Sequence, residues 1–301
     1  MKVVSVFLIF CFFVCTKFAL AQSKNTVIKL MPAGTVLYEN LNYNSDKQIR
    51  HQLDIYVPST GKHSYPVVVL FHGGGWRKGD KFSAMDFLDQ TIQEMIQQDF
   101  AIVSINYRYS STDKFPAQVQ DCNDALKYIS ENSMRYHLDR NNIAVMGFSA
   151  GGHLAALTGL SNNDNVSKFF SNGQPERFKI KLIIDYYGIS NLETLSGPGT
   201  IDPNSGVQLL IGGKASELPD KAKEASPVSY IDSNDPPFFI VHGDSDEAVD
   251  VSQSKELSAL LNKKGVRNEL IIIPGAPHGG NMFDMPLIRA RLFALLKKHL
   301  K

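Results

Sequence analysis

The sequence has few cysteines and none of the short motifs that hold metals, nucleotides or organic cofactors. Only three cysteines occur in 301 residues, and two of them, Cys11 and Cys15, lie in an apolar segment at the N-terminus. CxxC, HExxH and GxxxxGK[ST] are absent, and no GxGxxG follows a strand pattern. We therefore expect no metal and no cofactor.

The chain also lacks an excess of charge of either sign. Its 31 basic and 30 acidic side chains give a formal net charge of +1 at pH 7. Loss of an N-terminal segment that contains Lys2 and Lys17 would leave 29 basic against 30 acidic side chains. No basic field for nucleic acid remains, so nucleic acid is not an expected partner.

A run long enough to span a membrane is missing from the N-terminus. Lys2 precedes an apolar stretch, and Ala19-Leu20-Ala21 closes it. A charged start, a short apolar middle and an A-x-A site are typical of a cleaved secretory signal. A membrane anchor needs about 20 apolar residues, and Lys17 interrupts this stretch too early. We expect a signal peptide over residues 1–21 and no stable membrane insertion.

The mature chain, residues 22–301, is expected to be secreted or periplasmic after cleavage near Ala21. Cleavage leaves Cys122 as its one cysteine, so an intramolecular disulfide is excluded. Cys122 lies within a helical pattern, which favours a packed cysteine over a nucleophile. A sequence with 43% hydrophobic and 20% charged residues suits a single large α/β domain with a substantial core.

Strand patterns alternate with helical patterns after residue 50. The strand patterns cover residues 52–58, 65–71, 101–107, 142–147, 181–187, 238–243 and 269–274, and helical patterns cover residues 85–97 and 116–131. The first strand alternates polar and apolar residues, which predicts a half-exposed strand near one edge, whereas most of the others are continuously apolar. Together they predict a mostly parallel twisted sheet with helices on both faces, whose ligands bind at the carboxyl ends of the strands.

A serine lies between one of these strands and a helix. Gly147-Phe148-Ser149-Ala150-Gly151 follows the apolar run, and an Ala/Leu-rich helical pattern starts at once. This is the layout of a nucleophile elbow, in which a strained turn lifts the serine hydroxyl clear of the sheet. Gly147 and Gly151 are expected because a Cβ there would collide with the neighbouring strand or helix. An ordinary serine in a glycine-rich turn is the alternative.

A glycine run follows another strand. Residues 65–71 lead directly into His72-Gly73-Gly74-Gly75-Trp76. Unshielded backbone N–H groups in such a loop can point at a developing oxyanion, so we expect the N–H groups of Gly74, Gly75 and Ala150 to form an oxyanion hole. A phosphate-binding loop is the alternative, but Lys78 is misplaced for one.

The general base can be found by elimination among the eight histidines. In elbow enzymes the chain order is serine, acid, histidine, so the base follows Ser149 with the acid between them. Four histidines precede the serine. His153 lies on the elbow helix, His242 precedes the expected acid and His299 belongs to the final helix. His278, in a loop after the last strand, remains.

The acid is expected in the loop after the strand 238–243. This loop offers Asp244, Asp246 and Asp250. The acid accepts the Nδ1–H of His278 and stabilises the imidazolium. Asp246 is favoured because Asp244 could close the turn and Asp250 could open the next helix, but spacing alone does not choose among the three.

A set of motifs resembles the α/β-hydrolase superfamily. The motifs are His72-Gly-Gly-Gly-Trp76, Gly147-Phe-Ser-Ala-Gly151, His242-Gly-Asp-Ser-Asp-Glu-Ala-Val249 and Pro277-His-Gly279. The chain is most similar to hormone-sensitive-lipase-like carboxylesterases and to bacterial bifunctional feruloyl and acetyl-xylan esterases, over nearly all of residues 50–298. The resemblance implies the α/β-hydrolase fold and assigns the acid to Asp246. Asp250 stands where the family usually has proline, which affects the shape of the loop.

The resemblance implies a serine carboxylesterase that hydrolyses acetyl or feruloyl esters. Because a secreted enzyme with an accessible serine suits a large substrate, we expect these esters on plant polysaccharide such as xylan. The residues before Leu53 are too few and too polar for a large apolar cap, so we expect a minimal one. Residues 188–235 are the one sizeable insertion between strands and are expected to lie over or beside the pocket.

Four aromatic residues are candidates for an acyl-binding site. They are Trp76, Phe148, Tyr186 and Tyr187. Core packing is the alternative for Phe148 and the two tyrosines.

Other functions remain open at this point. A small-molecule short-chain carboxylesterase, an exopeptidase or an arylformamidase-like hydrolase would use the same triad, although no β-propeller typical of the peptidases is encoded. A binding domain without activity is disfavoured because Ser149, Asp246 and His278 are all present. The expected partner is an acylated carbohydrate or a small ester, and the sequence leaves the oligomeric state open.

Overall fold

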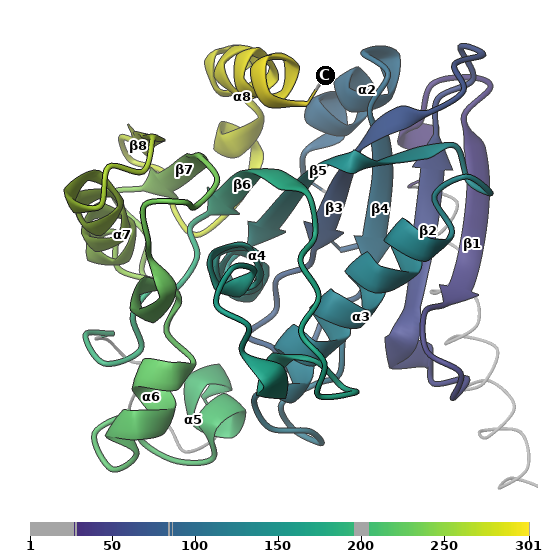
Figure 1. Cartoon of the computed structure of the whole chain (residues 1–301). Helices are drawn as coiled ribbons and strands as arrows, with labels where there is room; N and C mark the ends of the chain where they lie inside the picture. The colour runs from purple at the N-terminus through teal and green to yellow at the C-terminus, as the bar shows by residue number, and fades with distance from the viewer. Residues whose placement is uncertain (1–26, 28, 84, 86, 196–204, 301) are drawn as a thin grey trace, which may run out of the picture.

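The structure is a computed structural model that describes residues 27, 29–83, 85, 87–195 and 205–300. The expected signal peptide, residues 1–21, lies outside the described residues and stays a prediction. The described chain forms an eight-stranded sheet in the order β1-β2-β4-β3-β5-β6-β7-β8 (Figure 1).

Strands and helices alternate along the chain from β3 onward. The strands are β1 (Val36–Asn42), β2 (Gln52–Val57), β3 (Tyr65–Phe71), β4 (Ala101–Ile105), β5 (Leu138–Phe148), β6 (Ile180–Tyr186), β7 (Phe238–Gly243) and β8 (Asn268–Ile273). The α-helices are α2 (Asp89–Gln97), α3 (Ala117–Glu131), α4 (Ala150–Ser161), α5 (Gly206–Ile211), α6 (Pro219–Glu224), α7 (Ser252–Lys263) and α8 (Pro286–His299). Short 3₁₀ turns cover Ile49–His51, Ser167–Phe169, Pro227–Tyr230 and Asn281–Asp284.

The sheet is parallel from β4 to β8. β2 pairs antiparallel with β1 and with β4, and each later pair of neighbours is parallel. Parallel strands end at one edge of a sheet, so the loops after β3, β5, β7 and β8 gather there. The predicted α/β-hydrolase fold, with its mostly parallel sheet, is confirmed.

Helices cover both faces of the sheet. In β3, Val67 and Val69 pack with residues of α3, α4 and α7, whereas Val68 and Leu70 pack with residues of α2 and α8. Successive side chains of a strand point to opposite faces, so a strand buried on both faces is apolar throughout. Figure 1 shows α8 and α2 together on one side of the sheet and α3 and α4 on the other. Cys122 is buried in α3, as expected for a packed cysteine.

The edge of the sheet differs from the prediction. The strand 52–58 was expected to be half exposed near an edge, but every residue of β2 after Gln52 is buried. β1 is the edge strand and shields β2. Its pairing shifts between Tyr38 and Leu41, which breaks the alternation of period two by which a strand is found in a sequence.

Two glycines let α4 pack directly on the sheet. A Cβ on Gly147 would overlap the main chain of Gly151 in α4, and a Cβ on Gly151 would overlap the carbonyl groups of Phe71 and His72 at the end of β3. Neither glycine has a positive φ angle, so the requirement is space rather than backbone freedom. The expected collision is confirmed.

We predict that Gly147→Ala lowers the free energy of unfolding by about 1–3 kcal/mol or more, because two backbone segments must separate to admit the methyl group. Urea denaturation measures this change. Gly213→Ala is the matched control, since its Cβ would meet only the flexible side chain of Leu218. Equal midpoints for the two variants would contradict the prediction.

Candidate active site

Ser149 occupies the turn between β5 and α4. Its backbone has φ 55° and ψ −118°, a conformation that residues with a Cβ rarely adopt. Hydrogen bonds hold the turn on both sides, because the N–H of Ser149 donates to the carbonyl of Tyr186 at 2.9 Å and its own carbonyl accepts the N–H of His153 at 3.0 Å. The half-buried hydroxyl lines a pocket.

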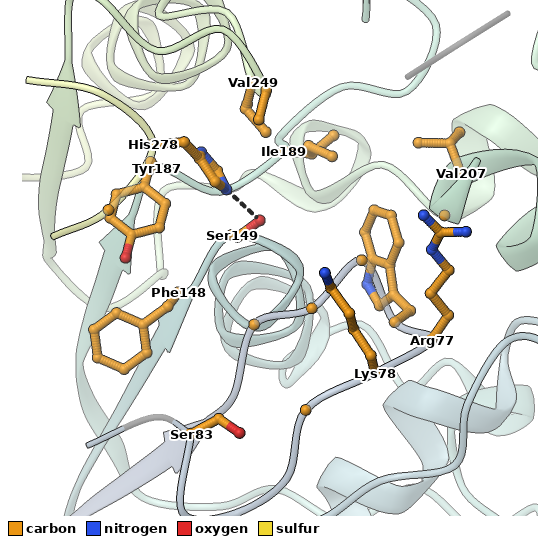
Figure 2. A pocket seen from close by; sticks show the side chains of 18 of the residues that line it. Arg77, Lys78, Ser83, Phe148, Ser149, Tyr187, Ile189, Val207, Val249 and His278 are labelled. Atoms are coloured by element: carbon orange, nitrogen blue, oxygen red, sulfur yellow. Dashed lines mark hydrogen bonds between the residues drawn. The ribbon is translucent and has the colours of Figure 1, made fainter. Parts of the chain in front are cut away.

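The structure brings together three side chains from three loops. Nε2 of His278 lies 2.8 Å from Oγ of Ser149, and Nδ1 lies 2.6 Å from Oδ2 of Asp246. The contact between serine and histidine is drawn in Figure 2. With its proton on Nδ1, directed at the carboxylate, His278 accepts the serine proton at Nε2. This is the geometry by which a base activates a hydroxyl nucleophile.

The carboxylate of Asp246 is buried and well hydrogen-bonded. Besides the His278 bond, Oδ2 lies 3.2 Å from Nε2 of His242, and Oδ1 accepts the N–H groups of Ala248 and Val249 at 2.8 Å each. Burial raises the pKa of this carboxyl, but the hydrogen bonds from His242, His278 and Val249 outweigh burial and hold the pKa well below its usual range. Asp246 is therefore ionised at neutral pH.

The other two aspartates of this loop have structural partners. Oδ1 of Asp244 accepts the N–H of Gly275 at 2.6 Å and so ties the loops after β7 and β8 together. Oδ1 of Asp250 accepts the N–H of Ser252 at 2.8 Å, where α7 begins. Within the described chain, Asp246 is the one of the three that is hydrogen-bonded to His278.

His242 contacts the same carboxylate oxygen of Asp246 as His278, and sequence reasoning missed its role. It is completely buried, its Nδ1 accepts the hydroxyl of Ser254 at 2.7 Å, and its Nε2–H donates to the carbonyl of Val249 at 2.9 Å while facing Asp246. A histidine near the end of an otherwise apolar strand is the signal that could have found it, because a buried imidazole needs polar partners.

The glycine loop after β3 lines the pocket beside Ser149. Gly74 and Gly75 have φ angles of 111° and 60°, and a Cβ on Gly74 would overlap the carbonyl of Lys78. Across the described residues, the N–H groups of Gly74, Gly75 and Ala150 are engaged in no hydrogen bond. All three are thus available to a negatively charged oxygen.

Buried polar contacts anchor this loop. Nζ of Lys81 lies 2.5 Å from Oδ1 of Asp54 in β2, and both side chains are almost fully buried. Burial lowers the pKa of Lys81, and the neighbouring carboxylate of Asp54 opposes that effect. At the start of the loop, the carbonyl of His72 accepts the hydroxyl of Tyr107 at 2.7 Å. Both ends of the loop are therefore tied to the sheet.

A buried histidine connects the loop with α4 and with the insertion between β6 and β7. The indole N–H of Trp76 donates to Nδ1 of His153 at 3.2 Å, and the Nε2–H of His153 donates to the carbonyl of Ala225 at 2.7 Å. Burial lowers the pKa of His153 to about 4, so the imidazole is neutral at physiological pH.

The four aromatic candidates have different surroundings. Trp76, Phe148 and Tyr187 line the pocket, and the ring of Tyr187 lies 4.7 Å from that of His278. Tyr186 does not line the pocket. It is completely buried among other aromatic rings, so the expectation that it contacts substrate gives way to core packing.

The pocket has a volume of about 640 Å³ and opens above Ser149. Four residues of the insertion 188–235 contribute to its wall: Ile189, Leu195, Gly206 and Val207. The insertion was expected over or beside the pocket, and these residues place part of it there.

In the described chain, no group of three or more His, Cys, Asp or Glu side chains is arranged to hold a metal ion. Its described helices include none with the length and apolar character needed to cross a membrane.

The chain belongs to the BD-FAE family, whose model matches residues 53–261. A truncated carbohydrate esterase from gut microbiota has a TM-score of 0.80 at 27% identity, over 89% of this chain and 98% of that one. A bifunctional GH43-CE protein of Bacteroides eggerthii has a TM-score of 0.79 at 31% identity, over 88% of this chain and 35% of that one. These similarities confirm the resemblance inferred from the motifs.

Similarity to curated proteins covers only part of their length. Esterase LipQ of Mycobacterium tuberculosis is 29% identical over 231 residues, which are 76% of this chain and 53% of LipQ. The chain spans about half the length of LipQ and of two further curated relatives from the same organism, LipC and LipM.

We predict that protonation of His153 destabilises the fold. Its pKa of about 4 lies below the usual value of 6.5, so the unfolded chain binds more protons between pH 6.5 and pH 4, and stability falls as pH falls through that window. Over the whole window, protonation of His153 lowers the free energy of unfolding by about 3 kcal/mol. His153→Gln keeps an acceptor for Trp76 and a donor for Ala225 but does not titrate.

Urea denaturation at pH 7 and pH 4.5 is the measurement. His153→Gln should lose less stability between the two pH values than wild type, and the exposed His63→Gln should lose as much as wild type. An identical loss in wild type and His153→Gln would contradict the role of His153.

Proposed function

We propose that this chain is a serine carboxylic ester hydrolase. The observation that carries the proposal is the hydrogen-bonded series from Ser149 through His278 to the buried Asp246, at the wall of an open pocket. Membership of the BD-FAE family and similarity to proteins named as esterases support the same class.

The proposed reaction has two halves. His278 takes the hydroxyl proton at Nε2 while Oγ of Ser149 attacks the ester carbonyl, and Asp246 stabilises the imidazolium. The N–H groups of Gly74, Gly75 and Ala150 hold the oxyanion, each contributing about 3 kcal/mol. His278 then protonates the leaving alcohol. Water, activated by the same histidine, releases the acid from the acyl-enzyme.

We propose acetyl or feruloyl esters on a polysaccharide such as xylan as the substrates. Two solved structures similar to this chain are named as a carbohydrate esterase and a GH43-CE protein, which supports a carbohydrate ester. The rings of Phe87, Phe148 and Tyr187 offer apolar walls for an aromatic acyl group. The expected signal peptide agrees with a polymer found outside the cell.

Acetate and ferulate release from acetylated and feruloylated xylan tests this proposal, with wild type and Ser149→Ala in parallel. Release that disappears with Ser149 supports a polysaccharide deacylase, and the ratio of the products shows whether the pocket admits aromatic acids. No release from xylan, with rapid cleavage of 4-nitrophenyl acetate, would instead favour a small-molecule carboxylesterase.

We predict that Ser149→Ala lowers kcat for 4-nitrophenyl acetate by about five to six orders of magnitude, because the acyl-enzyme no longer forms. Thermal unfolding followed by circular dichroism should show that the variant remains folded. A folded Ser149→Ala variant that retains more than about a hundredth of wild-type activity would rule out Ser149 as the nucleophile.

We also predict that Asp246→Asn lowers kcat by about four orders of magnitude, because the amide stabilises the wrong histidine tautomer. Asp244→Asn is the matched control from the same loop, and it should affect stability more than kcat, since Asp244 bonds to Gly275. If Asp244→Asn proves the more damaging change to kcat, the assignment of the acid is wrong.

A further inference from the structure

The described wall of the pocket carries positive charge and no acidic side chain. Arg77 and Lys78 lie at its rim, next to the glycine loop. Aspartate and glutamate are absent from its described lining residues. The pocket therefore presents a positive field to a bound molecule, and a concave wall concentrates such a field.

Lys78 differs in its pairing from several other lysines of the chain. Lys62, Lys81, Lys168 and Lys214 each have a carboxylate oxygen within 2.7 Å. Lys78 has no ion pair and no side-chain hydrogen bond within the described part of the chain. Its ammonium group is thus available to an anion brought by a ligand.

The position of Lys78 relative to Ser149 is set by its backbone. The N–H of Lys78 donates to the carbonyl of Gly74 at 3.2 Å, so the residue is tied to the glycine loop. Figure 2 shows its side chain rising from that loop with the amine directed into the pocket. Phe148 and Tyr187 lie on the opposite side of Ser149 in the same view. Ser149 therefore lies between the rings of Phe148 and Tyr187 on one side and the amine of Lys78 on the other.

We propose that Lys78 binds a carboxylate on the alcohol part of the substrate, so that the enzyme prefers acyl esters of uronic acid-containing saccharides. The inference rests on the proposed function. Acetyl and feruloyl groups are neutral, so the anionic group must belong to the sugar, and the aromatic wall is left for the acyl group. A lysine suits this task because its ammonium group pairs with a carboxylate in many orientations.

The test compares two substrates that differ only at C6, mono-O-acetylated methyl glucuronoside and mono-O-acetylated methyl glucoside. Acetate release gives kcat/KM for each, and the ratio of acidic to neutral substrate is the readout. Wild type should favour the glucuronoside about fivefold, the upper end for an exposed ion pair. Lys78→Gln should abolish the preference, Lys78→Arg should retain it, and salt should weaken it.

Lys263→Gln is the control for net charge, since this exposed lysine lies on α7 and outside the pocket lining. It should keep the wild-type ratio. A ratio that is the same in wild type, Lys78→Gln and Lys78→Arg overturns the role of Lys78 while leaving the esterase proposal intact. Failure of wild type to release acetate from either sugar overturns the carbohydrate-ester proposal, and the inference with it.

Discussion

The close packing of α4 against the ends of β5 and β3 is the constraint on which the rest of the site depends. Gly147 and Gly151 permit it, because a methyl group at either position would meet main-chain atoms. The packing forces Ser149 into a sharp turn and sets the first N–H of α4 beside the glycine loop after β3. A strained serine can persist only where its surroundings determine its conformation, and here hydrogen bonds to Tyr186 and His153 do so.

Buried polar side chains hold the loops around this turn. His153 joins the loop after β3 to the insertion, Lys81 joins the end of the same loop to β2, and His242 supports the carboxylate of Asp246. Each would destabilise the protein if it were buried without partners, since an unpaired polar group in a core costs several kcal/mol. With their hydrogen bonds made, these groups specify one arrangement of loops that have little regular structure of their own.

The pocket has two chemically different walls, and this division is the basis of the proposals on function. The rings of Phe148 and Tyr187 provide one, apolar wall, and Lys78 and Arg77 belong to the other, cationic wall, where Val207 also lies. An ester has two parts that must both be accommodated when its carbonyl reaches Ser149. A neutral acyl group on the apolar wall and a charged sugar on the cationic wall would satisfy both sides at once.

Local sequence patterns determined the class of fold and the candidates for the site. Continuous apolar runs predict buried parallel strands, GxSxG after a strand predicts the turn, and chain order singles out His278. Tertiary structure decided what depends on distance. Asp246, rather than Asp244 or Asp250, reaches His278 because the loops after β7 and β8 meet, and spacing along the chain does not encode that meeting. Tyr186 and Tyr187 are neighbours in sequence, yet only Tyr187 lines the pocket, because β6 ends at Tyr186 and the backbone of Tyr187, with a φ angle of 44°, leaves the strand. The edge strand β1 and the orientation of Lys78 towards the pocket were likewise visible only in three dimensions, since both depend on the packing of the folded chain.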